Sequence, residues 1–71
     1  MRIDDDHSII CSIVSRTIPE GEFWSVRVDH EESQVVVVLN APSKQLEAAL
    51  EAYIRAKRAR IEIDPDISVV V

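Results

Sequence analysis

Glycine is nearly absent from this chain, since Gly21 is the only glycine in 71 residues. Loops that bind phosphate need several glycines, because the backbone must approach the phosphate closely. Gly21 follows Pro19 and Glu20, and this Pro-acid-Gly order is typical of a turn between two strands. The sequence therefore contains no motif of a nucleotide-binding fold.

Cysteine and histidine are also scarce. The one cysteine, Cys11, excludes an internal disulfide and is typical of a reducing compartment. The nitrogen and sulfur ligands are limited to His7, His30 and Cys11, and no two of them have the spacing of a zinc site. Cys11 has no histidine beside it in sequence, so we expect a buried structural cysteine and neither a metal nor a cofactor.

Long apolar runs are missing as well. The run Val35 to Leu39 is far shorter than a membrane span. The first residues are acidic and lack the apolar segment of a signal peptide. These features predict a cytoplasmic protein that does not associate with membranes.

What the chain does contain is acid and aliphatic residues. Thirteen acidic residues against eight basic ones give a net charge of -5, which opposes binding to the phosphates of nucleic acids. Apolar residues make up 46% of the chain and the mean hydropathy is +0.01, so we expect residues 1–71 to fold as one small domain, with 1–7 as a frayed arm. The acidic pairs fall in turns and termini, where solvent screens them, and so short a chain has little room for a deep pocket. We expect no enzyme activity and no small-molecule substrate.

The segment Ala41 to Arg60 predicts a long helix, because it is dense in strong helix formers. Ser43 follows Pro42 and is a suitable N-cap. An apolar stripe recurs at intervals of three and four residues: Leu46, Ala49, Leu50, Tyr53 and Ile54.

Two neighbouring segments predict strands. Phe23 to Asp29 alternates and places Trp24, Val26 and Val28 on the side that we expect to be buried. Gln34 to Asn40 contains an unbroken apolar run, which is typical of a strand covered on both faces. We also expect extended chain at 61–64 and a short strand at 67–71, separated by the turn at Pro65.

Ser8 to Ile18 has two interpretations. As a helix, it would place Ile10, Ile13, Val14 and Thr17 on one face behind an acidic first turn. As a strand, it would place Ile10 and Val14 opposite Ile9, Cys11 and Ile13. The content of β-branched residues and serine, followed by a turn, favours the strand.

These elements predict an α+β protein with the order β-β-β-α-β, in which one long helix covers one face of an antiparallel sheet. The alternative is α-β-β-α-β, with residues 8–16 helical. In the first arrangement the other sheet face would be apolar and uncovered, which is typical of an interface. Its residues would be Ile9, Cys11, Ile13, Val36 and Val38.

The function expected from this pattern is a non-enzymatic interaction module, such as a regulator, adaptor or inhibitor. It would dock an apolar sheet face or a strand edge on itself or on a protein partner. One alternative is a nucleic-acid-associated protein that uses the basic end of the long helix, namely Arg55, Lys57, Arg58 and Arg60. The other is an acidic mimic of nucleic acid that uses Glu31, Glu32, Asp64 and Asp66.

Overall fold

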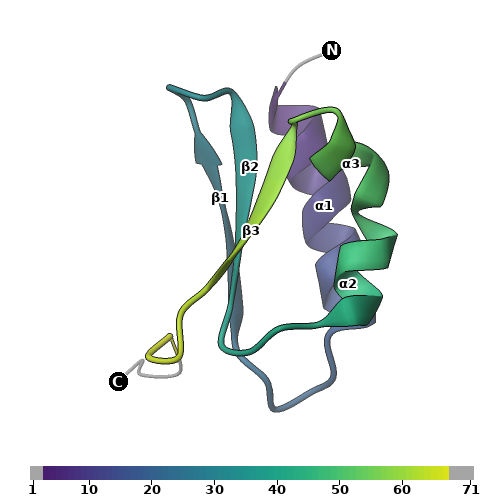
Figure 1. Cartoon of the computed structure of the whole chain (residues 1–71), viewed down its shortest axis with the longest axis vertical. Coiled ribbons are helices and arrows are strands. Elements are labelled where there is room, and N and C mark those ends of the chain that lie inside the picture. Colours follow the sequence, from purple (N-terminus) through teal and green to yellow (C-terminus); the bar gives the residue numbers. More distant parts are fainter. Residues whose placement is uncertain (1–2, 68–71) are drawn as a thin grey trace.

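The computed structural model describes residues 3–67 and has an α+β fold with all of its helices on one side of a three-stranded sheet (Figure 1). The helices are α1 (Ile3–Thr17), α2 (Lys44–Ala49) and α3 (Glu51–Arg55), and the strands are β1 (Trp24–Asp29), β2 (Gln34–Leu39) and β3 (Ala59–Ile63). The order α-β-β-α-α-β confirms the α+β class. It agrees with the alternative in which residues 8–16 are helical.

The prediction of a strand at 8–18 is wrong, because residues 8–17 belong to α1 and Ile18 is in a bend. Asp4, Asp5 and Asp6 occupy the first turn of this helix, where negative charge is favourable to the helix dipole. Ile10 and Val14 lie one turn apart and are fully buried. Burial of this stripe outweighs the poor helix propensity of the β-branched residues. Residues 3–7 are likewise part of α1 and not a frayed arm.

The first two strands form the predicted hairpin. β1 and β2 pair antiparallel from Trp24 opposite Leu39 to Asp29 opposite Gln34, and the connection is the predicted segment 30–33. Ser33 adopts the left-handed conformation in this turn, with φ 53. β3 pairs parallel to β2, so the sheet is mixed and the prediction of a purely antiparallel sheet is wrong. The parallel pair follows from the return of α2 and α3 across the sheet between β2 and β3.

The long helix is nearly continuous but bends at Leu50, whose φ and ψ are -101 and 7. Hydrogen bonds from Leu50 N to Leu46 O and from Ile54 N to Leu50 O, both 2.9 Å, continue the helical pattern across this residue. Ser43 is the N-cap as predicted, and its Oγ accepts a hydrogen bond from Leu46 N. The helical segment ends at Arg55 and not at Arg60, because β3 begins at Ala59.

Lys57 terminates α3 in the left-handed conformation, with φ 60, at a position that usually requires glycine. The amide of Lys57 donates to the carbonyl of Ile54 at 3.0 Å, and that of Arg58 donates to the carbonyl of Tyr53 at 2.8 Å. These two bonds form a Schellman motif. They satisfy carbonyls at the end of the helix without a glycine.

The hydrophobic core lies between the helices and the sheet. It contains fully or almost fully buried side chains from α1, α2, β2, β3 and the bend: Ile10, Val14, Val35, Val37, Leu39, Leu46, Leu50 and Ala59. Trp24 and Val26 pack against it from β1, which confirms the predicted inward side of that strand. After β3 the chain turns, and the amide of Asp66 donates to Oδ1 of Asp64 at 3.0 Å. The predicted strand at 67–71 lies outside the described residues apart from Ile67, which is in this turn.

Candidate functional site

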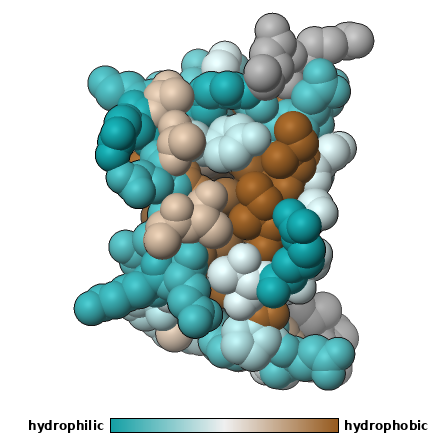
Figure 2. All heavy atoms as spheres, turned by 90° about the vertical axis from the view of Figure 1, so that its right-hand side faces the viewer, coloured by the Kyte–Doolittle hydropathy of each residue, from teal (hydrophilic) through white to brown (hydrophobic). Residues whose placement is uncertain are grey.

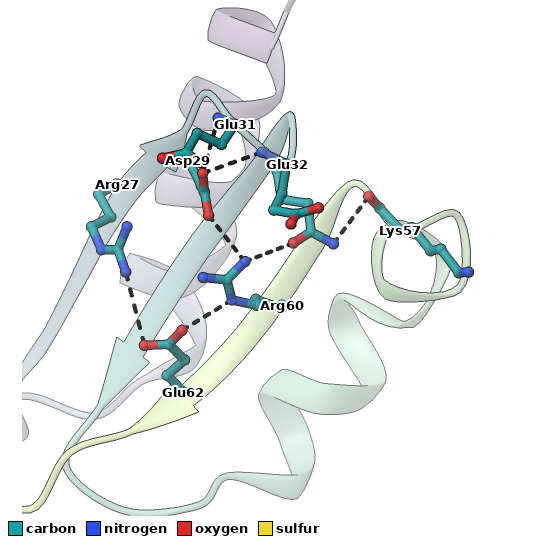
Figure 3. Close-up of polar contacts among 8 residues, drawn as sticks. Arg27, Asp29, Glu31, Glu32, Lys57, Arg60 and Glu62 are labelled. Carbon is teal, nitrogen blue, oxygen red and sulfur yellow. Dashed lines mark hydrogen bonds and ion pairs between the residues drawn. The ribbon is translucent and has the colours of Figure 1, made fainter.

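The outer face of the sheet, on the side away from the helices, carries a network of charged side chains centred on Arg60 (Figure 3). Nε of Arg60 donates to Oε2 of Glu62 at 3.0 Å, and Nη1 donates to Oε1 of Gln34 at 2.8 Å. The same Nη1 lies 3.3 Å from Oδ2 of Asp29. Nη2 of Arg27 lies 3.9 Å from Oε1 of Glu62. The network thus joins all three strands.

Asp29 belongs both to this network and to the hairpin turn. Its Oδ1 accepts hydrogen bonds from the amides of Glu31 and Glu32, at 3.0 and 3.2 Å. The bond from the Glu32 amide is the main cause that lowers the pKa of the Asp29 carboxyl below its ordinary value, and the bond from Arg60 adds to it. The hydrogen bond to Glu62 raises the pKa of the Arg60 guanidinium. The charged forms of both groups are therefore favoured.

Val36 lies beneath this network and is completely buried, with 0% exposure. It stands between Arg27 on β1 and Arg60 on β3 in the strand register. The aliphatic stems of two arginines can cover a neighbouring apolar side chain while their charged ends form ion pairs. Val38 is half-buried between Ser25 and Glu62. The expectation of a bare apolar sheet face is therefore wrong, and Val36 is not accessible to a partner in this conformation.

The other three residues of the predicted interface lie on α1, so they do not share a surface with Val36 and Val38. Ile9 and Ile13 follow Asp6 at helical spacing on the flank toward α2 and α3, where Asp6 contacts Arg58. Ile9 is 45% exposed and Ile13 is half-buried. Figure 2 shows apolar side chains gathered in the middle of the helix layer, with hydrophilic side chains around them.

Cys11 lies on the other flank of α1, beside His7. No histidine is adjacent to Cys11 in sequence, but the helix brings His7 and Cys11 together one turn apart. Nε2 of His7 is 3.3 Å from the carbonyl oxygen of Val26, and Sγ of Cys11 is 4.0 Å from Nδ1 and 3.9 Å from Nε2. A carbonyl can only accept, so Nε2 carries the proton and Nδ1 of a neutral ring has the lone pair. The i,i+4 spacing was the signal for this pair, but it is meaningful only on a helix. Cys11 is half-buried rather than buried.

The two edges of the sheet differ. Within residues 3–67 the strand order is β1-β2-β3, so β1 and β3 each have one neighbouring strand. On β1, the carbonyl of Val26 accepts a hydrogen bond from His7, so α1 covers part of this edge. Among the hydrogen bonds of the described residues, no corresponding side-chain bond reaches the backbone within β3.

Backbone geometry identifies the outward residues of β3. The carbonyl of Arg58 accepts from Val35 N at 2.9 Å, and Asp64 N donates to the carbonyl of Leu39 at 2.8 Å. In a parallel ladder, every second residue directs its N–H and C=O to the same neighbour. Arg60 and Glu62 therefore bond to β2. The other residues of the strand direct their backbone groups away from the sheet: Ala59, Ile61 and Ile63.

This edge of β3 also has apolar side chains. Ile63 is 43% exposed and Ile61 is half-buried against the core. Ile54 on α3 is 36% exposed. Tyr53 is turned toward α1, since the guanidinium of Arg58, which binds Asp6, lies 5.3 Å from the centroid of the Tyr53 ring. Ile54 follows Tyr53 by about 100° around the helix, which turns it toward β3.

The four basic residues of the nucleic-acid hypothesis do not share one surface. Arg58 forms a fork with the carboxylate of Asp6 on the helix side, and Arg60 belongs to the network on the opposite sheet face. Arg55 donates to Glu51 within α3, and Lys57 is exposed at the end of that helix. The four acidic residues of the mimicry hypothesis are also divided. Glu31 and Glu32 follow the end of β1, whereas Asp64 and Asp66 follow β3 at the opposite end of the sheet.

No family model, curated protein or solved structure matches this chain. The described helices are too short and too polar to cross a membrane. Between residues 3 and 67, the structure has no pocket and no group of three or more potential metal ligands. Among residues 3–67 no strand pairs with the outer edge of β3, and this edge, with its backbone groups and aliphatic side chains, is the candidate functional site.

Proposed function

We propose that this chain is a small non-enzymatic interaction module that docks an extended segment of a protein along the edge of β3. The observation that carries the proposal is the outward backbone groups of Ile61 and Ile63, of which Ile63 is 43% exposed, while Ala59 at the start of the strand is only 2% exposed. A strand edge of this kind is a template for another strand, which gains main-chain hydrogen bonds and apolar contacts together.

The surroundings of the edge support this choice over the sheet face. The face is closed by the Arg60 network, and the edge of β1 is partly occupied by His7. Natural proteins protect an edge with proline, charged side chains or a covering segment, and the charges of β3, Arg60 and Glu62, lie on its outer face. On the core side β3 has neither proline nor a charged residue, since its side chains there are Ala59, Ile61 and Ile63. An added strand would place apolar residues beside Ile61 and Ile63 and under Ile54.

The experiment compares substitutions at two positions whose wild-type side chains are almost equally exposed. Ile63 is 43% exposed at the edge of β3, and Phe23 is 44% exposed immediately before β1. Immobilised wild-type chain, Ile63→Lys and Phe23→Lys are each incubated with an extract of the native source, and retained proteins are quantified by mass spectrometry. A charge at the edge opposes strand addition.

We expect Ile63→Lys to lose at least 90% of a stoichiometric partner that the wild-type chain and Phe23→Lys both retain. A thermal melt of each variant verifies that the fold is intact. If the two lysine variants retain every protein equally, the edge of β3 is not the docking site and the proposal fails.

A further inference from the structure

We infer that the segment docked at β3 is the β3 strand of a second copy of this chain, paired antiparallel about a two-fold axis at Ile61. The inference rests on the proposed function, because it specifies the occupant of the same edge. It joins two three-stranded sheets into one continuous sheet of six strands. The interface is isologous, in which the same residues of both copies meet.

The hydrogen-bonding pattern of the free edge fits this register. Ile61 directs both its N–H and its C=O outward, so two copies of Ile61 facing each other exchange two hydrogen bonds. In the same register Ala59 faces Ile63 of the other copy, and both of these residues also direct their backbone groups outward. The central pair of bonds at Ile61 defines the register, because Ala59 is only 2% exposed in the single copy. A shift by one residue would pair outward-directed groups with inward-directed groups.

The charges on β3 select the same register. Arg60 and Glu62 alternate with the outward residues and lie on the outer face, where they already bind each other at 3.0 Å. Antiparallel pairing at Ile61 places Arg60 of each copy opposite Glu62 of the other, which gives two cross-strand pairs of opposite charge. A shift by two residues in one direction places Arg60 opposite Arg60, and in the other direction Glu62 opposite Glu62. Both shifts place like charges opposite each other, which is unfavourable. The strand is therefore complementary to itself in one register.

The helix layer leaves the Ile63 end of this edge accessible, whereas Ala59 is only 2% exposed. On the β1 side, α1 reaches the outer edge, since His7 contacts the carbonyl of Val26. α2 and α3 connect β2 to β3 on the same side of the sheet as α1, and Leu46 and Leu50 lie in the core. Ile54 and Ile63, both exposed in one copy, would then be covered at the junction of the two copies. The pairing therefore buries two of the exposed large apolar side chains.

Cysteine cross-linking tests the register directly. With Cys11→Ser to remove the native thiol, Ile61→Cys places two thiols opposite each other on the axis. Residues in a hydrogen-bonded antiparallel pair have Cα atoms about 5.5 Å apart, which is within disulfide range. Diamide accepts the two electrons and two protons that the thiols lose. In the control, Cys11→Ser with Ile63→Cys, the two thiols are four residues apart along the paired strands and out of reach.

We expect the Ile61→Cys protein to form a covalent dimer at least tenfold faster than the Ile63→Cys protein. Equal rates, or faster cross-linking of the Ile63→Cys protein, would overturn the inference. Because Ile61→Cys removes some core packing, sedimentation equilibrium of the wild-type chain and Ile63→Lys provides a second measurement. We expect a monomer–dimer equilibrium that Ile63→Lys weakens at least tenfold and Phe23→Lys leaves unchanged.

A wild-type chain that is monomeric at every concentration, or a dimer that Ile63→Lys does not weaken, would refute self-pairing. These results test self-pairing and not the proposed function, which has its own test. If the chain is monomeric but retains a different protein through Ile63, the docking edge stands and only its occupant has been misassigned.

Discussion

Arg58 and Asp6 are 52 residues apart in sequence and form a two-pronged ion pair that joins the N-terminal turn of α1 to the start of β3. Nε of Arg58 donates to Oδ2 of Asp6 at 2.9 Å, and Nη2 donates to Oδ1. Only 3% of Asp6 is exposed. A carboxylate so far removed from water requires a charged partner. Its hydrogen bond is also the main cause that raises the pKa of the Arg58 guanidinium.

Asp6→Asn tests this pair. The amide keeps the size of the side chain but removes its charge and one of its acceptor oxygens, and thus weakens the link between α1 and β3. We expect the melting temperature to fall by several degrees. Asp5→Asn is the matched control, because Asp5 is exposed in the same helical turn, and its melting temperature should change little. Equal effects of the two substitutions would show that the fork with Arg58 contributes nothing beyond the helix dipole.

The lowered pKa of Asp29 predicts that the protein loses stability in acid. The folded pKa of Asp29 is below the ordinary value of 3.8, chiefly because of the amide of Glu32, so folding favours its charged form. This contribution is fully present above pH 3.8 and is lost as the pH falls through the lower, folded value. The free energy of unfolding, measured with urea between pH 2 and 7, should depend less on pH in Asp29→Asn than in the wild-type chain. The difference should appear as the pH falls below 3.8. If the free energy of unfolding depends on pH equally in both proteins, the hydrogen bonds of Asp29 do not favour its charged form.

Lys57→Gly should stabilise the protein. Lys57 has φ 60, a conformation that costs a residue with a Cβ roughly 1–2 kcal/mol. Glycine removes this cost but loses more entropy on folding, so we expect a net gain of about 1 kcal/mol in the free energy of unfolding. Ala56→Gly is the control: Ala56 has φ -79, and glycine there should destabilise the protein. A loss of stability in Lys57→Gly would show that the lysine side chain has a structural role.

Val36→Ala tests whether the Arg60 network covers an apolar core residue. Full burial of a side chain of this size contributes about 1.5–3 kcal/mol, so its truncation should lower the free energy of unfolding by roughly 2 kcal/mol. Val38→Ala, on the same face but half-buried, should cost less than half as much. Chemical denaturation measures both. Equal, small effects would mean that Val36 is exposed in solution and that this face is available for docking after all.

Local patterns in the sequence were sufficient to predict the hairpin and the second helical segment. The alternation of Trp24, Val26 and Val28, the apolar run that begins at Val35 and the cap at Ser43 all act over a few residues. The fold class follows from these elements. The error at α1 arose because propensity favoured a strand, whereas burial of Ile10 and Val14 against a distant sheet favoured a helix. Such tertiary contacts are not visible in a local pattern.

The candidate site could be predicted only in outline. A strand edge was among the expected modes of docking, but its position depends on the parallel pairing of β2 with β3. The same pairing places Arg60 beside Val36 and closes the face that was expected to be bare. Neither the direction nor the register of a strand that follows a long crossover is encoded in its own few residues.

Amide hydrogen exchange, resolved by residue with NMR, tests the docking edge most directly. In the dilute chain we expect the amides of Ile61 and Ile63 to exchange fast, while those of Arg60 and Glu62 are protected by bonds to β2. As the chain associates, through higher concentration or addition of the captured partner, Ile61 and Ile63 should become at least tenfold more protected. Association that leaves these two amides unprotected, and instead protects another surface such as the exposed flank of α1, would contradict the account.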